Sequence, residues 1–137
     1  MEKLLFENEG YIISNDNGLH IVRYKAGVNI TEEIARQSIT ELKIMVGNKT
    51  VPILLDASSF FTMDKAAFTY VAINGSKLIR AQAVVVTDKI QEGTSILFEK
   101  FEKPPYPHKN FYNEDDAKSW LQQFMVNDQS IPKEECE

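Results

Sequence analysis

Asp56 and Asp64 are the acidic residues of this sequence whose positions could support general acid–base chemistry. Paired carboxylates serve as acid and base when their surroundings separate their pKa values. Both residues also have structural interpretations, which we favour. Asp56 ends a predicted strand, where its side chain can tie the following loop to backbone groups, and Asp64 is placed to cap a helix. An enzyme that uses this pair is therefore our third hypothesis, after a protein-interaction module and a ligand-binding protein.

The histidines and the cysteine do not form a recognisable catalytic or metal-binding pattern. His20 lies in a predicted strand and His108 in a proline-containing loop, and neither has a nucleophile at a known spacing. We interpret both histidines as ordinary surface or edge residues. Cys136 is the one cysteine, so no intramolecular disulfide can form, and the scattered carboxylates have no metal-ligand spacing. We therefore predict no metal site and no cofactor.

A phosphate-binding motif of the known kinds is also missing from the sequence. It contains no Walker A motif and no G-x-G-x-x-G after a strand. The helix that begins at Asp64 could offer free N–H groups to an anion, with Lys65 adding a positive charge. We favour a capped helix instead, because the Asp64 carboxylate would occupy those donors.

Composition narrows the class of partner. The formal net charge is -5, which argues against nucleic acid and against anionic membrane surfaces. No stretch approaches the roughly 20 apolar residues of a membrane span. The apolar run Leu4–Phe6 is too short for a signal peptide and has acidic neighbours, so we expect a cytoplasmic protein.

Alternating strand and helix patterns run along most of the chain. Strong turn formers at Asn15–Gly18 predict a hairpin between its first two strands. Strands are predicted at Tyr11–Ser14, Leu19–Tyr24, Val51–Leu55, Ala83–Val86 and Lys109–Tyr112. Helices are predicted from Thr31 to Val46, from Asp64 to about Ile73, from Asp88 to about Glu102, and after Asn113 as a cap.

This order predicts an α/β fold with one domain over residues 1–126. Strands that alternate with helices favour a mostly parallel sheet. We expect about five strands with an antiparallel N-terminal hairpin, covered by about four helices. Residues 127–137 are polar and lack periodicity, so we interpret them as a C-terminal tail.

Two segments carry a family resemblance. Leu54–Phe68, LLDASSFFTMDKAAF, resembles the central motif of STAS domains in anti-sigma-factor antagonists. Phe98–Leu121, with its Lys-Pro-Pro step and acidic turn before Trp-Leu, resembles a family of uncharacterised STAS/SEC14-like proteins, mostly from Bacteroidetes. The resemblance spans roughly Glu7 to Phe124. It implies a SpoIIAA-like fold and either a regulatory interaction or a bound hydrophobic ligand.

The sequence departs from regulatory STAS domains at one position that matters for function. Those domains carry a phosphorylatable serine after the second aspartate of the motif. Here Lys65, Ala66 and Ala67 follow Asp64. The resemblance therefore does not imply a phosphorylation switch, and Ser58 in the preceding loop is not assigned that role.

Apolar residues gather around the loop before the second helix and give the nearest signal of function. They either fill the core, which we slightly favour, or form a recognition patch. Our first hypothesis is a non-enzymatic protein-interaction or regulatory module that binds a protein partner or itself as a homodimer. The alternative is a small hydrophobic, lipid-like ligand in a pocket of roughly 300 Å³ or more. The predicted binding residues are Ser58, Ser59, Phe60, Phe61, Met63, Asp64, Lys65, Phe68 and Phe98.

Overall fold

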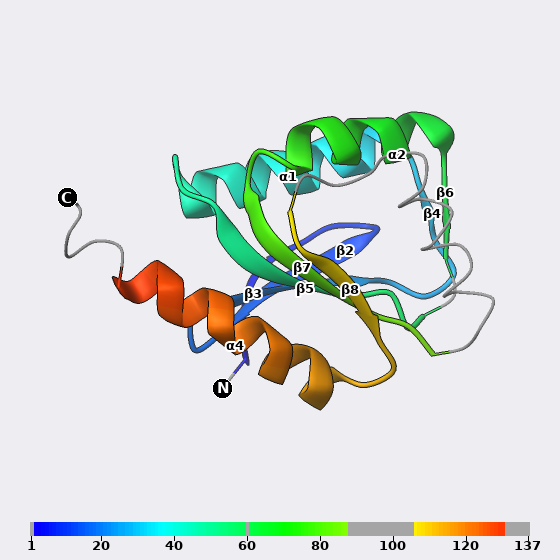
Figure 1. The fold of residues 1–137 in the computed structure, drawn as a ribbon. Helices are drawn as coiled ribbons and strands as arrows, with labels where there is room; N and C mark the ends of the chain where they lie inside the picture. The colour runs from blue at the N-terminus through cyan, green and yellow to red at the C-terminus, as the bar shows by residue number, and fades with distance from the viewer. Residues whose placement is uncertain (1, 60, 88–105, 131–137) are drawn as a thin grey trace.

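A six-stranded mixed sheet organises the chain in a computed structural model that describes residues 2–59, 61–87 and 106–130 (Figure 1). In spatial order its strands are β1 (Glu2–Glu7), β2 (Tyr11–Asp16), β3 (Leu19–Tyr24), β5 (Val51–Asp56), β7 (Ile79–Val85) and β8 (His108–Phe111). The pairs β1–β2 and β2–β3 are antiparallel, and β3–β5, β5–β7 and β7–β8 are parallel. The predicted α/β class with an antiparallel N-terminal hairpin is confirmed.

The hairpin between β2 and β3 has the turn chemistry that the sequence predicts. Asn17 and Gly18 both adopt positive φ, 54° and 95°. Asn15 closes the turn, because its side-chain oxygen accepts a hydrogen bond from the Gly18 N–H at 2.9 Å. Asparagine and glycine tolerate this left-handed backbone better than other residues, so the sequence fixes the register of the two strands.

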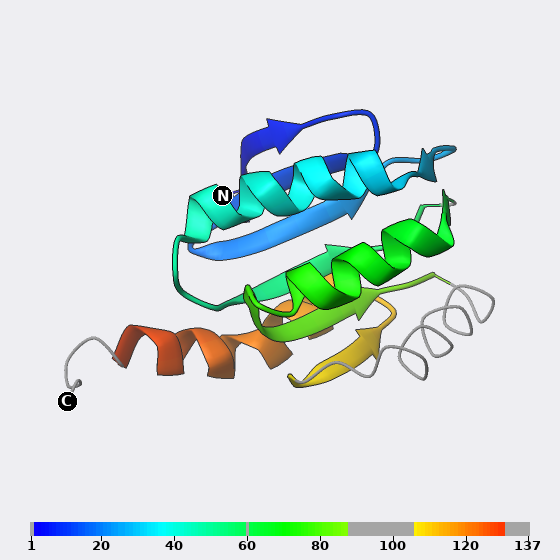
Figure 2. The same cartoon turned by 90° about the horizontal axis from the view of Figure 1, so that it is seen from above.

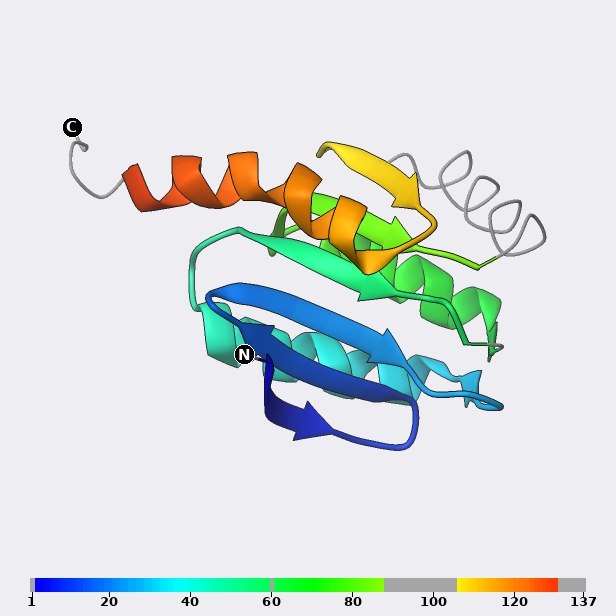
Figure 3. The same ribbon diagram turned by 90° about the horizontal axis from the view of Figure 1, so that it is seen from below.

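Helices cover the two faces of the sheet separately. Helix α1 (Glu32–Val46), helix α2 (Lys65–Tyr70) and the π-helical turn η1 (Val71–Gly75) lie over one face, and helix α4 (Glu114–Ser130) lies over the other (Figures 2 and 3). Two short strands, β4 (Asn29–Ile30) and β6 (Thr62–Met63), form a separate parallel ribbon. This ribbon joins the starts of α1 and α2.

Both predicted helix caps with a hydroxyl or amide side chain are confirmed. The Thr31 side chain accepts a hydrogen bond from the Ile34 N–H at the start of α1. At the start of α4 the Asn113 side chain accepts from the Asp116 N–H at 2.8 Å and donates to the Asp116 carboxylate at 3.0 Å. Helix α1 ends where predicted, at Gly47, which has a positive φ of 68°.

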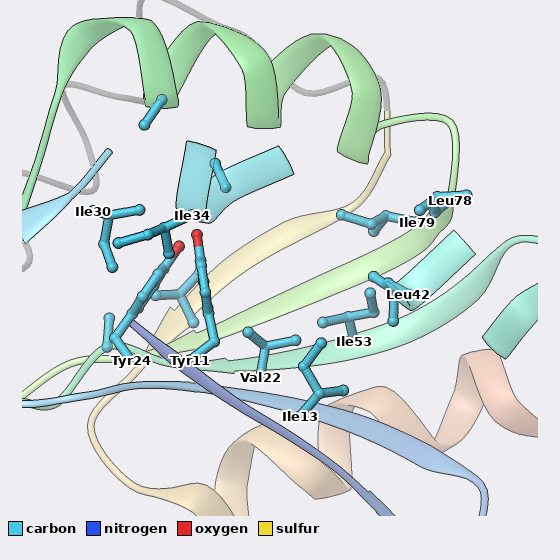
Figure 4. Packing of buried hydrophobic residues seen from close by; sticks show 14 of the residues in the cluster. Tyr11, Ile13, Val22, Tyr24, Ile30, Ile34, Leu42, Ile53, Leu78 and Ile79 are labelled. Carbon is cyan, nitrogen blue, oxygen red and sulfur yellow. The ribbon is translucent and has the colours of Figure 1, made fainter. Parts of the chain in front are cut away.

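Period-two alternation along the strands divides the core into two layers. One layer lies under α1 and α2 and includes Tyr11, Tyr24 and Ile53 (Figure 4). The other lies under α4 and includes Ile21, Leu54 and Leu121. Successive strand residues point to opposite faces, so a strand such as β3 supplies both layers.

Several sequence predictions differ from the structure. The sequence does not predict strand β1, because its three apolar residues Leu4, Leu5 and Phe6 are consecutive and give no alternating pattern. The short strands β4 and β6 were also missed. Helix α4 continues to Ser130, into the segment predicted as tail. The predicted helix at 88–102 lies outside the described residues.

His20 is not the surface or edge residue that we predicted. It lies in β3, which has β2 on one side and β5 on the other, and its side chain is half-buried. His108, which we predicted in the proline-containing loop, is the first residue of β8, and this strand lies at the edge of the described sheet. The sequence pattern of β3 alone could not reveal how many strands flank it.

Shortening the buried side chain of Leu121 tests how α4 packs on the core layer beneath it. Leu121 has no exposed surface, so we expect Leu121→Ala to lower the free energy of unfolding by about 3 kcal/mol. Urea denaturation followed by circular dichroism measures this value. Gln122→Ala on the exposed side of the same helix should change it by less than about 0.5 kcal/mol. Equal effects of the two substitutions would contradict the placement of α4.

Candidate functional site

The segment from Ser58 to Lys65 leaves the carboxyl end of β5 and leads into α2. At its beginning, the Ser58 N–H and hydroxyl both donate to Asp56 Oδ1, at 3.0 and 2.6 Å. At its end, the N–H groups of Thr62 and Asp64 donate to backbone carbonyls just before and within β4, at 3.0 and 2.9 Å. Both ends of the loop are therefore fixed. The prediction that Asp56 ties this loop to its strand is confirmed.

Asn29 in β4 links the side chains at the end of this segment. Its amide nitrogen donates to Asp64 Oδ1 at 3.1 Å, and its amide oxygen accepts from the Thr62 hydroxyl at 2.8 Å. Asp64 occupies the N-cap position of α2 but makes no side-chain capping hydrogen bond. The predicted capping interaction is therefore wrong, because Asn29 engages the carboxylate instead. Asn29, Thr62, Asp64 and Lys65 are all exposed.

The predicted apolar patch is divided between the core and residues outside the described structure. Phe61 is half-buried and stacks on Tyr24, with ring centroids 4.1 Å apart. Tyr24 in turn packs on Tyr11 at 5.0 Å, and the two rings lie side by side under the helices (Figure 4). Met63 is half-buried against the same core layer, and Phe68 is half-buried. Phe60 and Phe98 lie outside the described residues.

The tyrosines beneath Phe61 are protonated at neutral pH. Burial raises the pKa of Tyr24 to about 12 and raises the pKa of Tyr11 further. Burial also raises the pKa of Tyr106 to about 12. A tyrosine that keeps its proton cannot act as a base, so these rings serve as packing for the loop.

Arg23 forms a charged cluster that the sequence analysis missed. Its guanidinium contacts Asp56 at 2.6 Å and Glu2 at 2.7 Å, and it also pairs with Glu114. These four residues come from β3, β5, β1 and the first turn of α4. The hydrogen bonds to the carboxylates raise the pKa of Arg23, and the bond from Arg23 lowers the pKa of Glu2.

A second ion pair continues the cluster on the same face of the sheet. Lys118 of α4 contacts Asp16 of β2 at 3.1 Å. This contact raises the pKa of Lys118 and helps to lower that of Asp16. The signal in the sequence is the position of Arg23, which follows the apolar residues Leu19 and Ile21 on the face of β3 that packs under α4.

These contacts leave the two candidate catalytic carboxylates in separate networks. Arg23 and Ser58 engage Asp56, whereas Asn29 engages Asp64. His20 and His108 lie on β3 and β8, with β5 and β7 between them. Within the described part of the chain, no group of three or more His, Cys, Asp or Glu residues could hold a metal ion. The geometry therefore favours structural roles for these residues.

The order of the strands and the two helical layers define a SpoIIAA-like α/β domain. The chain belongs to the family described as domain of unknown function DUF7793, whose profile matches residues 12–125. It is similar in fold to the crystal structure of an uncharacterised DUF3478-family protein from Shewanella loihica PV-4, described as SpoIIAA-like. The TM-score is 0.62 at 17% identity, covering 88% of this chain and 95% of that one.

None of the curated proteins matches this sequence. The likeness to the solved structure, at 17% identity, is a likeness of fold. In the described residues, no helix is long and apolar enough to cross a membrane.

Removing the Arg23 cation should destabilise the fold in a pH-dependent way. We expect Arg23→Gln to lower the free energy of unfolding at pH 7 by about 2 kcal/mol, less than for a fully buried pair because the Arg23 side chain is 23% exposed. The hydrogen bond from Arg23 lowers the pKa of Glu2 below its usual 4.5, so this part of the stabilisation is complete above pH 4.5 and is lost as the pH falls through the lowered value. The difference between the wild type and the variant should therefore shrink in acid, and urea denaturation at pH 7 and at about pH 3 measures it.

Arg36→Gln is the matched control for this experiment. Arg36 pairs with Glu32 on the exposed side of α1, where the two side chains are 57% and 43% exposed. The Arg36 guanidinium also lies 4.6 Å from the centroid of the Tyr70 ring, so the loss of both exposed contacts should cost about 1 kcal/mol. A cost at Arg23 as small as that at Arg36 would show that the cluster does not hold the elements together.

His20 should titrate below the usual histidine range. Its Nδ1 is buried and has no hydrogen-bond partner among the described residues, and burial lowers its pKa from 6.5. The unfolded chain therefore takes up a proton below about pH 6.5 that the folded chain does not, and stability falls as the pH drops through this range. A proton NMR titration should give a pKa below 6.5 for His20, with His108→Gln to assign the signals. A value at or above 6.5 would contradict the burial of this ring.

Proposed function

We propose that this domain is a non-enzymatic, cytoplasmic protein-interaction module that binds its partner through the surface from Ser58 to Lys65. The observation that carries the proposal is the rigid attachment of this segment. Asp56 fixes its beginning, and Asn29 fixes its end. A surface that is ordered before binding loses less conformational entropy on association.

The exposed chemistry of this surface is polar, with apolar support beneath it. Thr62, Asp64, Lys65 and Ala66 are exposed, whereas Phe61 packs inward on Tyr24. Such a surface suits a partner that contributes hydrogen bonds and opposite charges. The notable feature is the β4–β6 ribbon, which presents these residues beyond the end of the main sheet (Figure 1).

Binding by this surface would not be controlled through the position that regulatory STAS domains phosphorylate. The positions after Asp64 hold Lys65 and Ala66, which have no hydroxyl, and Ala67, which is fully buried. A regulated version of the module would need another device to release the partner.

A small hydrophobic ligand is the second candidate, and we place it below protein binding. A pocket under the aromatic loop would require Phe61 and Met63 to stand away from the core. Both side chains instead pack against the core layer under α1 and α2. Native mass spectrometry of the purified chain tests this alternative, because a bound lipid adds a mass that leaves on denaturation.

A matched pair of double variants tests the proposed surface. Lys65→Glu/Ala66→Arg changes charge and bulk at the start of α2 and leaves the Asp64–Asn29 contact in place. Lys109→Glu/Ser119→Arg makes the same changes at exposed positions of β8 and α4. We expect a protein from the native host that binds the wild type and the control variant to bind the first variant at least about tenfold more weakly, with purified components.

A further measurement distinguishes binding of a different protein from self-association of this chain. Sedimentation velocity of the purified chain shows whether the bound protein is a second copy. Binding that is equal for the wild type and both variants would overturn the proposed surface. Circular dichroism of each variant shows that the fold is intact.

A further inference from the structure

A groove of about 490 Å³ lies between the carboxyl-terminal half of α1 and the turn η1. It lies at the opposite end of the sheet from the Ser58–Lys65 surface, near the start of β5 and β7 (Figure 1). Lys43, Lys49 and Lys77 line it, together with Ile44 and Asn74. The volume of the groove is typical of a small-molecule site. Such sites are mostly apolar, whereas three lysines line this groove.

Three lysines share this groove, and no carboxylate lies among the residues that line it. Arg23, Lys25 and Lys118 pair with carboxylates, whereas Lys3, Lys65 and Lys109 are exposed lysines on other surfaces that also have no ion pair among the described residues. The described residues provide no ion pair to Lys43, Lys49 or Lys77, and no Asp or Glu lines the groove. Lys43 suits the negative end of the α1 dipole, but that explanation does not extend to Lys49 and Lys77.

Exposed isoleucines accompany these lysines. Ile44, in the groove wall, is 71% exposed, and Ile73, immediately before the wall residue Asn74, is 55% exposed. Ile44 thus adds an exposed aliphatic side chain to the lysine-rich wall of the groove, and Ile73 lies next to that wall in the sequence. A partner that satisfied both kinds of residue would carry acidic and apolar side chains together.

The backbone of one groove wall is also unusual. Two residues of the groove wall flank or belong to the π-helical turn, a rare conformation that is frequent at functional sites. Tyr70 is the last residue of α2, immediately before the turn, and Asn74 lies within it. The Asn74 amide donates to the Tyr70 carbonyl at 3.1 Å and so stabilises the turn. Lys77 follows two residues after the turn ends.

We propose that this groove binds an acidic segment of a partner protein, whose carboxylates face the lysines and whose apolar side chains cover Ile44 and Ile73. The three lysines are exposed, so they suit rim contacts with a segment better than the enclosed coordination of a small anion. The net charge of -5 opposes an acidic ligand at long range, so its binding would depend on these local lysine contacts. The site is separate from the Ser58–Lys65 surface and does not depend on it.

Zero-length cross-linking with a carbodiimide tests the proposal directly. The reagent activates a carboxylate, and a lysine amine in contact with it then forms an amide bond and releases the urea product. The full chain is cross-linked in a cleared lysate of the native host, and mass spectrometry locates the joined peptides. We expect Lys49 and Lys77 to join Asp or Glu of a segment that also holds apolar residues, far more often than the exposed Lys3 and Lys109 do.

The affinity of the identified segment, made as a synthetic peptide, completes the test. Fluorescence anisotropy should show that Lys49→Glu/Lys77→Glu weakens binding about tenfold or more and that added salt weakens it further. Lys3→Glu/Lys109→Glu, which has the same change in net charge, should alter it less than about twofold. Ile44→Ser should also weaken binding, which a purely electrostatic contact would not predict.

Two cross-linking results would overturn the proposal: cross-links spread evenly over all exposed lysines, or cross-links to a second copy of this chain. An affinity for the peptide that Lys49→Glu/Lys77→Glu leaves unchanged would also overturn it. So would a small anion that native mass spectrometry detects on the wild type and that the same variant no longer binds. The Lys65→Glu/Ala66→Arg variant should keep full affinity for the peptide. Failure of the Ser58–Lys65 proposal is therefore distinguishable from failure of this one.

Discussion

The contact of one guanidinium with three carboxylates is the interaction on which the arrangement of elements depends. Arg23 lies in a central strand, and its partners lie in β1, β5 and the first turn of α4. The edge strand β1 has little buried apolar surface, so this contact and its backbone ladder hold it. Partly buried charges are costly unless they are paired. The pairing therefore selects one position for α4 and one for β1 relative to the sheet.

The same contact links the α4 face to the candidate surface. Asp56 uses one oxygen for Arg23 and the other for Ser58, so the residue that ends β5 also orients the loop beyond it. On the opposite face, Phe61 and Tyr24 support the loop through aromatic packing. Polar contacts thus fix where the segment begins, and apolar packing fixes how it lies. A surface of this kind is rigid without being part of the core.

The sequence predicted those features of the fold that depend on residues close together in the chain. The hairpin turn, the Thr31 and Asn113 caps and the stripe of α4 all depend on residues within one turn of each other. Contacts between distant segments were not predictable. No local pattern relates Arg23 to Glu114, or Asn29 to Asp64, and Asn29 is why Asp64 does not cap its helix. The candidate loop was located correctly, but the inward direction of Phe61 depends on Tyr24 of another strand.

The two ends of the domain differ in how their charged side chains are paired. Near the carboxyl end of β5, Arg23 is shared among three carboxylates, so its charge is neutralised by residues of the same chain. At the other end, the lysines of the groove have no carboxylate among the described residues to neutralise them. A protein of net charge -5 repels acidic partners at long range, so an uncompensated positive groove directs their approach to one place. Two surfaces of opposite character at the ends of one sheet would allow the domain to hold two partners at once.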